Sequence, residues 1–311
     1  MVTRTPLFMR KTPGGVYDYV NIGDFPADVW FVDSNHAGRG VTTGHGTHPD
    51  QPFSTFAYAY SSDLMATGDV CFLMPGHAET INSAAEIAAD IAGVDVRGLG
   101  RGSRRPTFTF DATGTTSTIT ITAADTRFSN MLMLTSGTID IANGLAVTGA
   151  DCVLDDIEWR ESAADSQWDD ALIISTGAAR CKVSRPIMRM HPSGNANEAG
   201  ILISAAVDGV EIWDANIDGL FATGCIESSA ANLNCHIVRP RLHIRHATQD
   251  SAVNMHSGTT GHIVDPYIRT ATNDAGGFNS AIVAAAMQIH NPSVVNAAGE
   301  RGGAWGTAST A

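Results

Sequence analysis

Five segments in the second half of the chain share one pattern at a nearly constant spacing. They are CVLDDIEW (152–159), CKVSRPIM (181–188), VEIWDANI (210–217), CHIVRPRL (235–242) and GHIVDPYI (261–268), and their starts lie 29, 29, 25 and 26 residues apart. A period of this length is typical of a solenoid, in which each repeat forms one coil that stacks on its neighbour.

Within the five segments the apolar residues fall into columns. The first column holds Cys152, Cys181, Val210, Cys235 and Gly261, the second Leu154, Val183, Ile212, Ile237 and Ile263, and the third Trp159, Met188, Ile217, Leu242 and Ile268. The first two columns are two residues apart, so their side chains point to one face of a strand. Proline then follows in three of the five copies (Pro186, Pro240, Pro266), which indicates a corner between two strands.

A further apolar ladder lies between these segments. Its members are ALIIS (171–175), GILIS (200–204), GCIES (224–228), SAVNMH (251–256) and AAMQIH (285–290). Each coil therefore contains at least three short strands, and the chain is expected to be an all-β parallel β-helix over residues 29–295, with equivalent residues stacked about one strand spacing apart. The cysteines then become reduced core residues.

The parts that flank these coils give less regular signals. Residues 117–134 predict a strand, a turn at 123–125 and a second strand, whereas 86–100 is compatible with strands or with a helix. Phe53, Phe56, Tyr60 and Leu64 have helical spacing, so we expect a short helix near 52–65 that caps the N-terminal opening. Pro75-Gly76 marks a corner, and His77 and Glu79 are expected on its outside. The Gly/Ala-rich tail, residues 296–311, is expected to be disordered or to lie along a neighbour.

Charge limits the partners. The net charge of −13 argues against nucleic acid as a partner, because phosphate binding requires Lys and Arg. The positive charges of Arg4, Arg10 and Lys11 lie in a segment without acids, residues 1–17. No signal peptide and no apolar run long enough for a membrane span is apparent, so no membrane partner is expected.

Residues 29–81 contain Val32-Asp33-Ser34, Pro52-Phe53-Ser54-Thr55, Gly68-Asp69 and Pro75-Gly76 in that order. This series resembles the entry of pectate-lyase-like right-handed β-helix proteins, and MPGHAET followed by AGVDVRGLGRGSRRPTFTF (92–110) is similar to a group of bacteriophage virion proteins. The resemblance implies a right-handed β-helix, a location on the virion surface after synthesis in the host cytoplasm, and a homotrimer. Because the fold hosts lyases, hydrolases, adhesins and structural parts, it does not decide the function.

Two sets of residues are candidates for catalysis. A glycan hydrolase requires two carboxyl groups, for which Asp214 with Asp218, or Asp155, Asp156 and Glu158, are candidates; a lyase could use Arg185, Arg239 or Arg241. The carboxylates do not recur in one column, and Asp155 is expected over Ser184, Trp213 and Val238. We therefore predict no catalytic residue and no cofactor.

A Gly-rich loop, residues 36–48, contains His36, His45 and His48, a residue type that binds zinc. No acid or cysteine lies between these histidines, and the simpler interpretation is a surface loop. We therefore predict no metal site.

The strand RPRLHIRH (239–246) predicts an outward basic stripe of Arg239, Arg241, His243 and Arg245. This stripe is either a contact with another copy of the chain or a solvated face.

Residues 1–28 are expected to form a docking arm whose partner-binding residues are Arg4, Phe8, Arg10, Lys11, Tyr17 and Tyr19. Together these features favour a non-enzymatic capsid decoration protein that docks on the major capsid protein. The alternative is a tailspike or fibre component that binds or depolymerises host surface polysaccharide.

Overall fold

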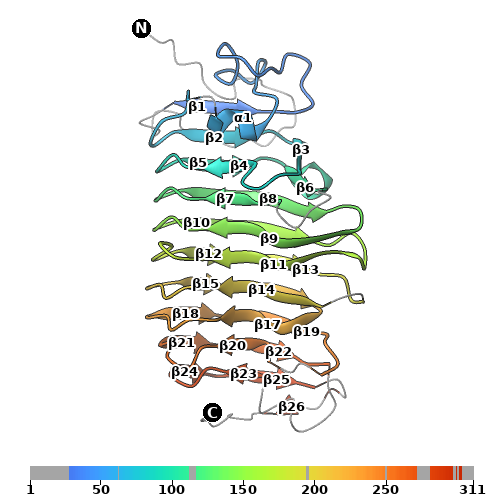
Figure 1. Ribbon diagram of the computed structural model, residues 1–311, viewed down its shortest axis with the longest axis vertical. Helices are drawn as coiled ribbons and strands as arrows, with labels where there is room; N and C mark the ends of the chain where they lie inside the picture. Colours follow the sequence, from blue (N-terminus) through green and yellow to red (C-terminus); the bar gives the residue numbers. More distant parts are fainter. Residues whose placement is uncertain are drawn as a thin grey trace, which may run out of the picture.

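The computed structural model describes residues 28–61, 63–111, 117–193, 196–248, 251–271, 281–296, 299 and 301–302. These residues form a parallel β-solenoid whose coils stack along one long axis, with β1 near one end and β25 near the other (Figure 1). One of its sheets contains eight strands, one from each successive coil. The expected parallel β-helix architecture is therefore confirmed.

Three ladders of parallel strands run the length of the rod. The first is formed by β1 (Val29–Val32), β2 (Val70–Leu73), β5 (Asp95–Gly98), β8 (Arg127–Thr135), β10 (Val153–Arg160), β12 (Lys182–Ser184), β15 (Glu211–Trp213), β18 (Cys235–Val238), β21 (Gly261–Val264) and β24 (Met287–His290).

The second ladder follows the corner. It is formed by β3 (Ala78–Ile81), β6 (Thr107–Phe110), the later parts of β8 and β10, β13 (Ile187–Arg189), β16 (Asn216–Gly219), β19 (Arg241–Ile244), β22 (Tyr267–Arg269) and β25 (Ser293–Val295).

The third ladder is the eight-stranded sheet. Its members are β4 (Ile87–Ala89), β7 (Ile119–Ile121), β9 (Ile139–Val147), β11 (Ser166–Ile174), β14 (Asn197–Ile203), β17 (Phe221–Ser228), β20 (Val253–Met255) and β23 (Ile282–Val283).

The predicted apolar columns lie in register through the core. The pairs Leu154–Val183, Val183–Ile212, Ile212–Ile237 and Ile237–Ile263 are each aligned across neighbouring strands, and the column from Trp159 to Ile268 is aligned in the same way. All of these side chains are buried. The core is therefore one continuous stack of apolar side chains, in which each residue is covered by its counterparts one coil away.

All five cysteines are free and buried, as predicted. Burial raises the pKa of the Cys235 thiol to about 12 and, despite one backbone hydrogen bond that opposes the effect, that of the Cys152 thiol to about 11. Thiols that stay protonated at neutral pH are poor nucleophiles and poor metal ligands, so these cysteines serve as small core residues.

The corner between the first two ladders repeats one backbone conformation. A single residue with φ between 48° and 57° occupies this position in seven successive coils: Asn130, Asp156, Arg185, Asp214, Arg239, Asp265 and Asn291. Asn and Asp tolerate this left-handed region better than most residues. The predicted prolines come one residue later, so the corner is set by the left-handed residue together with the proline that follows it in several coils.

A short helix, α1 (Phe56–Ser61), lies at the N-terminal end of the rod (Figure 1). It occupies part of the range expected for a capping helix. Phe56 is buried and its ring lies 5.9 Å from that of Phe108 and 5.7 Å from that of Phe128. The helix therefore covers the open end of the apolar stack.

The expectation that His77 and Glu79 lie outside the coil was wrong. The His77 side chain is completely buried and Glu79 is 9% exposed, because both lie on the same inward side as Ile81, whereas Ala78 and Thr80 between them face outward. The Glu79 carboxylate accepts hydrogen bonds from the amides of Phe56 (2.6 Å) and Ala57 (3.0 Å), and His77 Nε2 lies 3.2 Å from Glu79 Oε2. The pair thus satisfies the free amides at the start of α1.

Two other local predictions are corrected. The segment 285–290 contains β24, which pairs with β21 in the first ladder, and β23 continues the third ladder in its place. Residues 287–294 are therefore a sixth copy of the strand–corner–strand pattern. The stretch 86–100 forms β4 and β5 rather than a helix, with a 3-10 turn at Gly102–Arg104 after it.

The C-terminal tail contributes one strand. In β26 (Arg301–Gly302) it pairs antiparallel with β25, so part of the last strand edge is covered by the chain itself. The rest of the predicted tail lies largely outside the described residues.

We predict that E79A lowers the free energy of unfolding by about 2–4 kcal/mol, because two helix amides and His77 lose their buried partner. Urea denaturation followed by circular dichroism measures the effect. T80A, on the exposed side of the same strand, is the control and should change stability by less than about 0.5 kcal/mol. Equal effects of the two substitutions would contradict the capping role of Glu79.

A second prediction concerns the core column. I212A should cost about 2–5 kcal/mol, since Ile212 lies between Val183 and Ile237 and its truncation leaves a cavity. The same urea titration should show little change for V41A, because the Val41 side chain is 53% exposed. A small effect of I212A would show that the column is not tightly packed.

Candidate functional site

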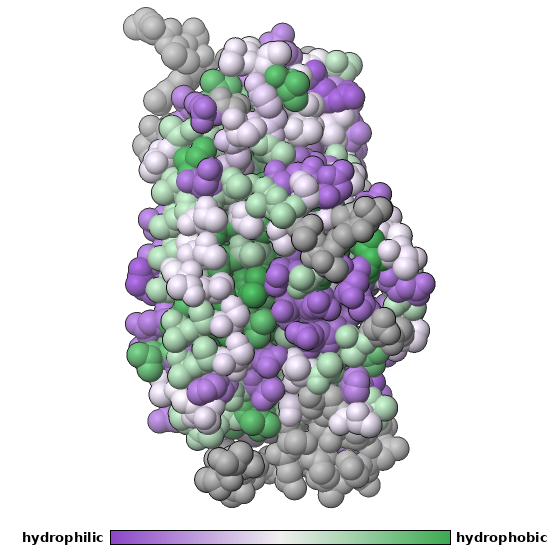
Figure 2. Space-filling view, viewed as in Figure 1, coloured by the Kyte–Doolittle hydropathy of each residue, from purple (hydrophilic) through white to green (hydrophobic). Residues whose placement is uncertain are grey.

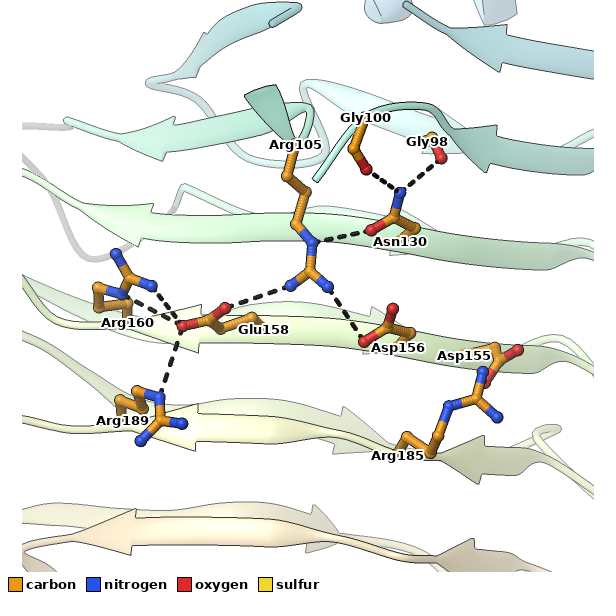
Figure 3. A network of polar contacts seen from close by, with 10 residues as sticks. All are labelled: Gly98, Gly100, Arg105, Asn130, Asp155, Asp156, Glu158, Arg160, Arg185 and Arg189. Carbon is orange, nitrogen blue, oxygen red and sulfur yellow. Dashed lines mark hydrogen bonds and ion pairs between the residues drawn. The ribbon is translucent and has the colours of Figure 1, made fainter. Parts of the chain in front are cut away.

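A network of ion pairs connects three coils on the outer surface at the corner between the first two ladders (Figure 3). Arg105 lies at its centre and donates to Asn130 Oδ1 (2.8 Å), Asp156 Oδ1 (3.1 Å) and Glu158 Oε2 (3.2 Å). Asn130 in turn donates to the carbonyls of Gly98 and Gly100. One largely buried guanidinium thus holds successive coils together.

Further ion pairs extend the network along β10 and to the coils on either side of it. Glu158 Oε1 accepts from Arg160 at 2.6 Å and lies 3.7 Å from Arg189 Nε. Asp155 pairs with Arg127 of the preceding coil (3.1 Å) and with Arg185 of the following coil (2.7 Å). Each of these carboxylates therefore faces guanidinium groups of its own chain.

Asp214 and Asp218 are paired in the same way. Arg239 donates two hydrogen bonds to Asp214 (2.7 and 2.8 Å), and this contact lowers the pKa of the Asp214 carboxyl despite a smaller opposing effect of burial. Arg245 donates to both oxygens of Asp218, and His243 Nδ1 lies 3.1 Å from Asp218 Oδ1. Burial favours the neutral form of Asp218, but the bonds from His243 and Arg245 outweigh it and hold the pKa well below its usual range.

These pairings bear on the catalytic candidates from the sequence. Asp155, Asp156, Glu158, Asp214 and Asp218 each contact at least one Arg of the same chain. A general acid in glycoside hydrolysis needs a raised pKa, whereas the pKa shifts of Asp214 and Asp218 go in the opposite direction. The arrangement is that of ion pairs that link coils.

The predicted basic stripe lies where expected, on the outer side of β18, β19 and their corner. Leu242 and Ile244 are buried, and Arg241 and Arg245 alternate with them on the outer side. Two of its cations, Arg239 and Arg245, are already bonded to Asp214 and Asp218 of the same chain. A contact between copies at this stripe therefore stays a prediction, and its free positive charge is smaller than the sequence indicates.

The predicted docking arm cannot be placed, because its partner-binding residues lie outside the described residues: Arg4, Phe8, Arg10, Lys11, Tyr17 and Tyr19.

In the Gly-rich loop each histidine binds its own turn: His36 Nδ1 accepts from Gly38, His48 Nδ1 from Asp50, and His45 Nδ1 contacts Thr42. Within the described ranges no three His, Cys, Asp or Glu side chains are arranged to hold a metal ion.

A row of carboxylates on the third ladder was not anticipated. Asp140 on β9, Asp169 and Asp170 on β11, Glu198 on β14 and Glu227 on β17 follow one another along the rod. A hydrophilic patch covers the N-terminal halves of β9, β11 and β14 in Figure 2. None of the ion pairs among the described residues involves these five carboxylates. We call this set the acidic row.

The acidic row contains the carboxyl groups with the largest upward pKa shifts. Burial, followed by repulsion from Asp140 and Glu198, raises the pKa of Asp169 to about 6. Burial and the negative charge of Glu198 raise the pKa of Asp170 to about 7, although Asp170 Oδ1 accepts a hydrogen bond from the Ala199 amide at 3.2 Å. Two adjacent carboxyl groups with raised pKa values therefore lie beside the other carboxyl groups of the row.

Such a combination can perform general acid and base chemistry, because one carboxyl group can donate a proton while its neighbour accepts one. The sequence contained a signal for the row. Asp169 and Glu198 are 29 residues apart, the same interval as the first strand–corner–strand segments, whereas Asp140 lies opposite Gln167 rather than Asp169. What the sequence does not show is that none of the described arginines forms an ion pair with them.

The comparisons with known proteins add no assignment: no family model, no curated protein and no solved structure matches this chain. Across the described part of the chain, no helix is long and apolar enough to cross a membrane.

A prediction follows from the raised pKa of Asp170. The folded state binds a proton that the unfolded state, with an Asp pKa near 3.9, releases, so the free energy of unfolding falls as pH rises from about 4 to about 7. D170N removes this charge and keeps an oxygen for the Ala199 amide. It should stabilise the protein on the order of 2 kcal/mol at pH 8 and distinctly less at pH 5.

Thermal and urea unfolding at both pH values measure this difference. D90N, an exposed aspartate beyond β4, is the control with the same change of charge. A gain from D170N that is the same at pH 5 and pH 8 would contradict the raised pKa.

Proposed function

We propose that this chain is a non-enzymatic structural protein, a rigid rod that decorates a bacteriophage capsid. The observation that carries the proposal is the pairing of all five carboxylates that could have served catalysis at the corners with arginines of neighbouring coils. These residues are committed to holding coils together.

The architecture supports the same proposal. Apolar side chains stack without interruption from coil to coil, and the corner between the first two ladders is a single left-handed residue in seven of the coils. Such a scaffold keeps its shape while its outer surface varies, which suits a component of a shell. The phage origin rests on the resemblance of residues 29–110.

The proposed partners are the major capsid protein and further copies of this chain. Residues 1–28 would dock on an acidic capsid patch through Arg4, Arg10 and Lys11, with Phe8, Tyr17 and Tyr19 as apolar anchors. A trimer is the proposed assembly state.

The test uses virions produced with the full chain and with a variant that lacks residues 1–20. We expect many copies spread over the shell for the full chain, and a folded but unattached protein for the variant, measured by electron cryomicroscopy and by sedimentation with particles. A few copies confined to the tail would overturn the decoration proposal. Undiminished attachment of the variant would exclude the arm.

A second candidate is a glycan depolymerase that uses the acidic row. The raised pKa values of Asp169 and Asp170 favour it, since Asp169 could act as the acid and Glu198 as the base. Release of reducing ends from a panel of bacterial surface polysaccharides is the assay. Activity lost in D169N and E198Q but retained in D214N would support the depolymerase, and absence of release from every polysaccharide would support the structural role.

A further inference from the structure

A shallow groove of about 470 Å³ lies on the outer side of the second ladder, over β16, β19 and β22. Two outward columns line it. Asn216, Arg241 and Tyr267 are aligned in one column, and Asp218, His243 and Arg269 in the other. Neighbours within a column are about 4.8 Å apart and the columns about 7 Å apart, so the six side chains form a grid of the size of one or two sugar rings.

Tyr267 provides an aromatic surface in this groove. Its side chain is 45% exposed, and it is the only aromatic residue among the large exposed apolar side chains of the described residues. An exposed tyrosine ring presents an apolar face for the C–H side of a sugar, together with a hydroxyl that can hydrogen-bond. Most other rings in the described part of the chain are taken up by the core.

Two guanidinium groups flank this ring. Arg241 is the direct neighbour of Tyr267 on β19, and Arg269 lies two residues after it on β22. Both are exposed, and neither forms an ion pair with a described carboxylate. In a chain with a net charge of −13, two arginines that pair with no described carboxylate form, beside one exposed ring, a local positive site.

Contacts within the chain hold the Asp218 and His243 side chains that also line the groove. Arg245 and His243 both contact the Asp218 carboxylate, so its negative charge is balanced within the chain. The His243 ring is thereby oriented at the side of the groove. The balanced Asp218 leaves the positive charge of Arg241 and Arg269 available to a ligand.

We propose that this groove binds an acidic saccharide, with the ring of Tyr267 against one face of the sugar and Arg241 and Arg269 on its carboxylate. Guanidinium groups bind carboxylates through paired hydrogen bonds, and an aromatic ring beside them selects a ligand that also has an apolar face. An acidic peptide satisfies the arginines but does not require the ring. The site is distinct from the acidic row, which lies on a different ladder and would repel such a ligand.

The test is binding of a hyaluronan hexasaccharide, which contains glucuronate, to the full chain by isothermal titration calorimetry and saturation-transfer NMR. We expect binding that weakens as salt is raised, because exposed charges carry part of it. R241Q, R269Q and Y267A should each weaken binding about tenfold, the size expected for one charge-assisted hydrogen bond or one aromatic contact. R101Q, an exposed arginine outside the groove, should leave binding unchanged.

Two further ligands distinguish an acidic saccharide from an uncharged saccharide and from an acidic peptide. Chitohexaose, an uncharged saccharide, should bind at least tenfold more weakly than the hyaluronan fragment, and a hexa-aspartate peptide should be insensitive to Y267A. Equal binding of chitohexaose would overturn the role of the arginines, and equal loss with R101Q would show non-specific attraction. Absence of binding by all three ligands, as expected if the face is buried between copies, would overturn the proposal; sedimentation of the chain would then reveal the oligomer.

Discussion

The parallel, in-register stacking of coils is the constraint on which the rest of the structure depends. Each residue lies about 4.8 Å from its counterpart in the next coil, so every position is repeated in space as a column. Inside the rod this favours apolar residues, as in the column from Leu154 to Ile263. Outside, it brings side chains of successive coils into contact whether or not their charges are compatible.

Stacking has opposite electrostatic effects at the corners and in the acidic row. At the corners, arginines alternate with carboxylates, as in Arg127, Asp155 and Arg185, and each charge has an opposite neighbour. In the acidic row Asp169 and Glu198 are not separated by a cation, so burial and mutual repulsion raise the pKa of Asp169. Stacking thus stabilises the corners, and it places like charges side by side in the acidic row.

The sequence predicted the columns because the period is regular and the residues that repeat are apolar. It misplaced 285–290 because strands of different ladders have the same apolar pattern; only Asn291-Pro292, the corner signal after β24, distinguishes them. The burial of His77 and Glu79 was not predicted, since their partner α1 is more than twenty residues away and the need to cap it arises only in three dimensions. The acidic row was not predicted either, because the sequence does not show which carboxyl groups lack an arginine partner among the described residues.

The residues inside the coils and those on their outer side are largely independent, so the outer side can bind a ligand without any change in the core. Ile217 and Leu242 alternate with Asp218 and His243 along the same strands, so the inward residues keep the coils stacked whatever the outward ones do. The second ladder can therefore present Arg241, Tyr267 and Arg269 while the third presents carboxylates, without conflict in folding. A rod of this kind supplies rigid columns at fixed spacing, and its ligand chemistry is decided by which side chains face outward on each ladder.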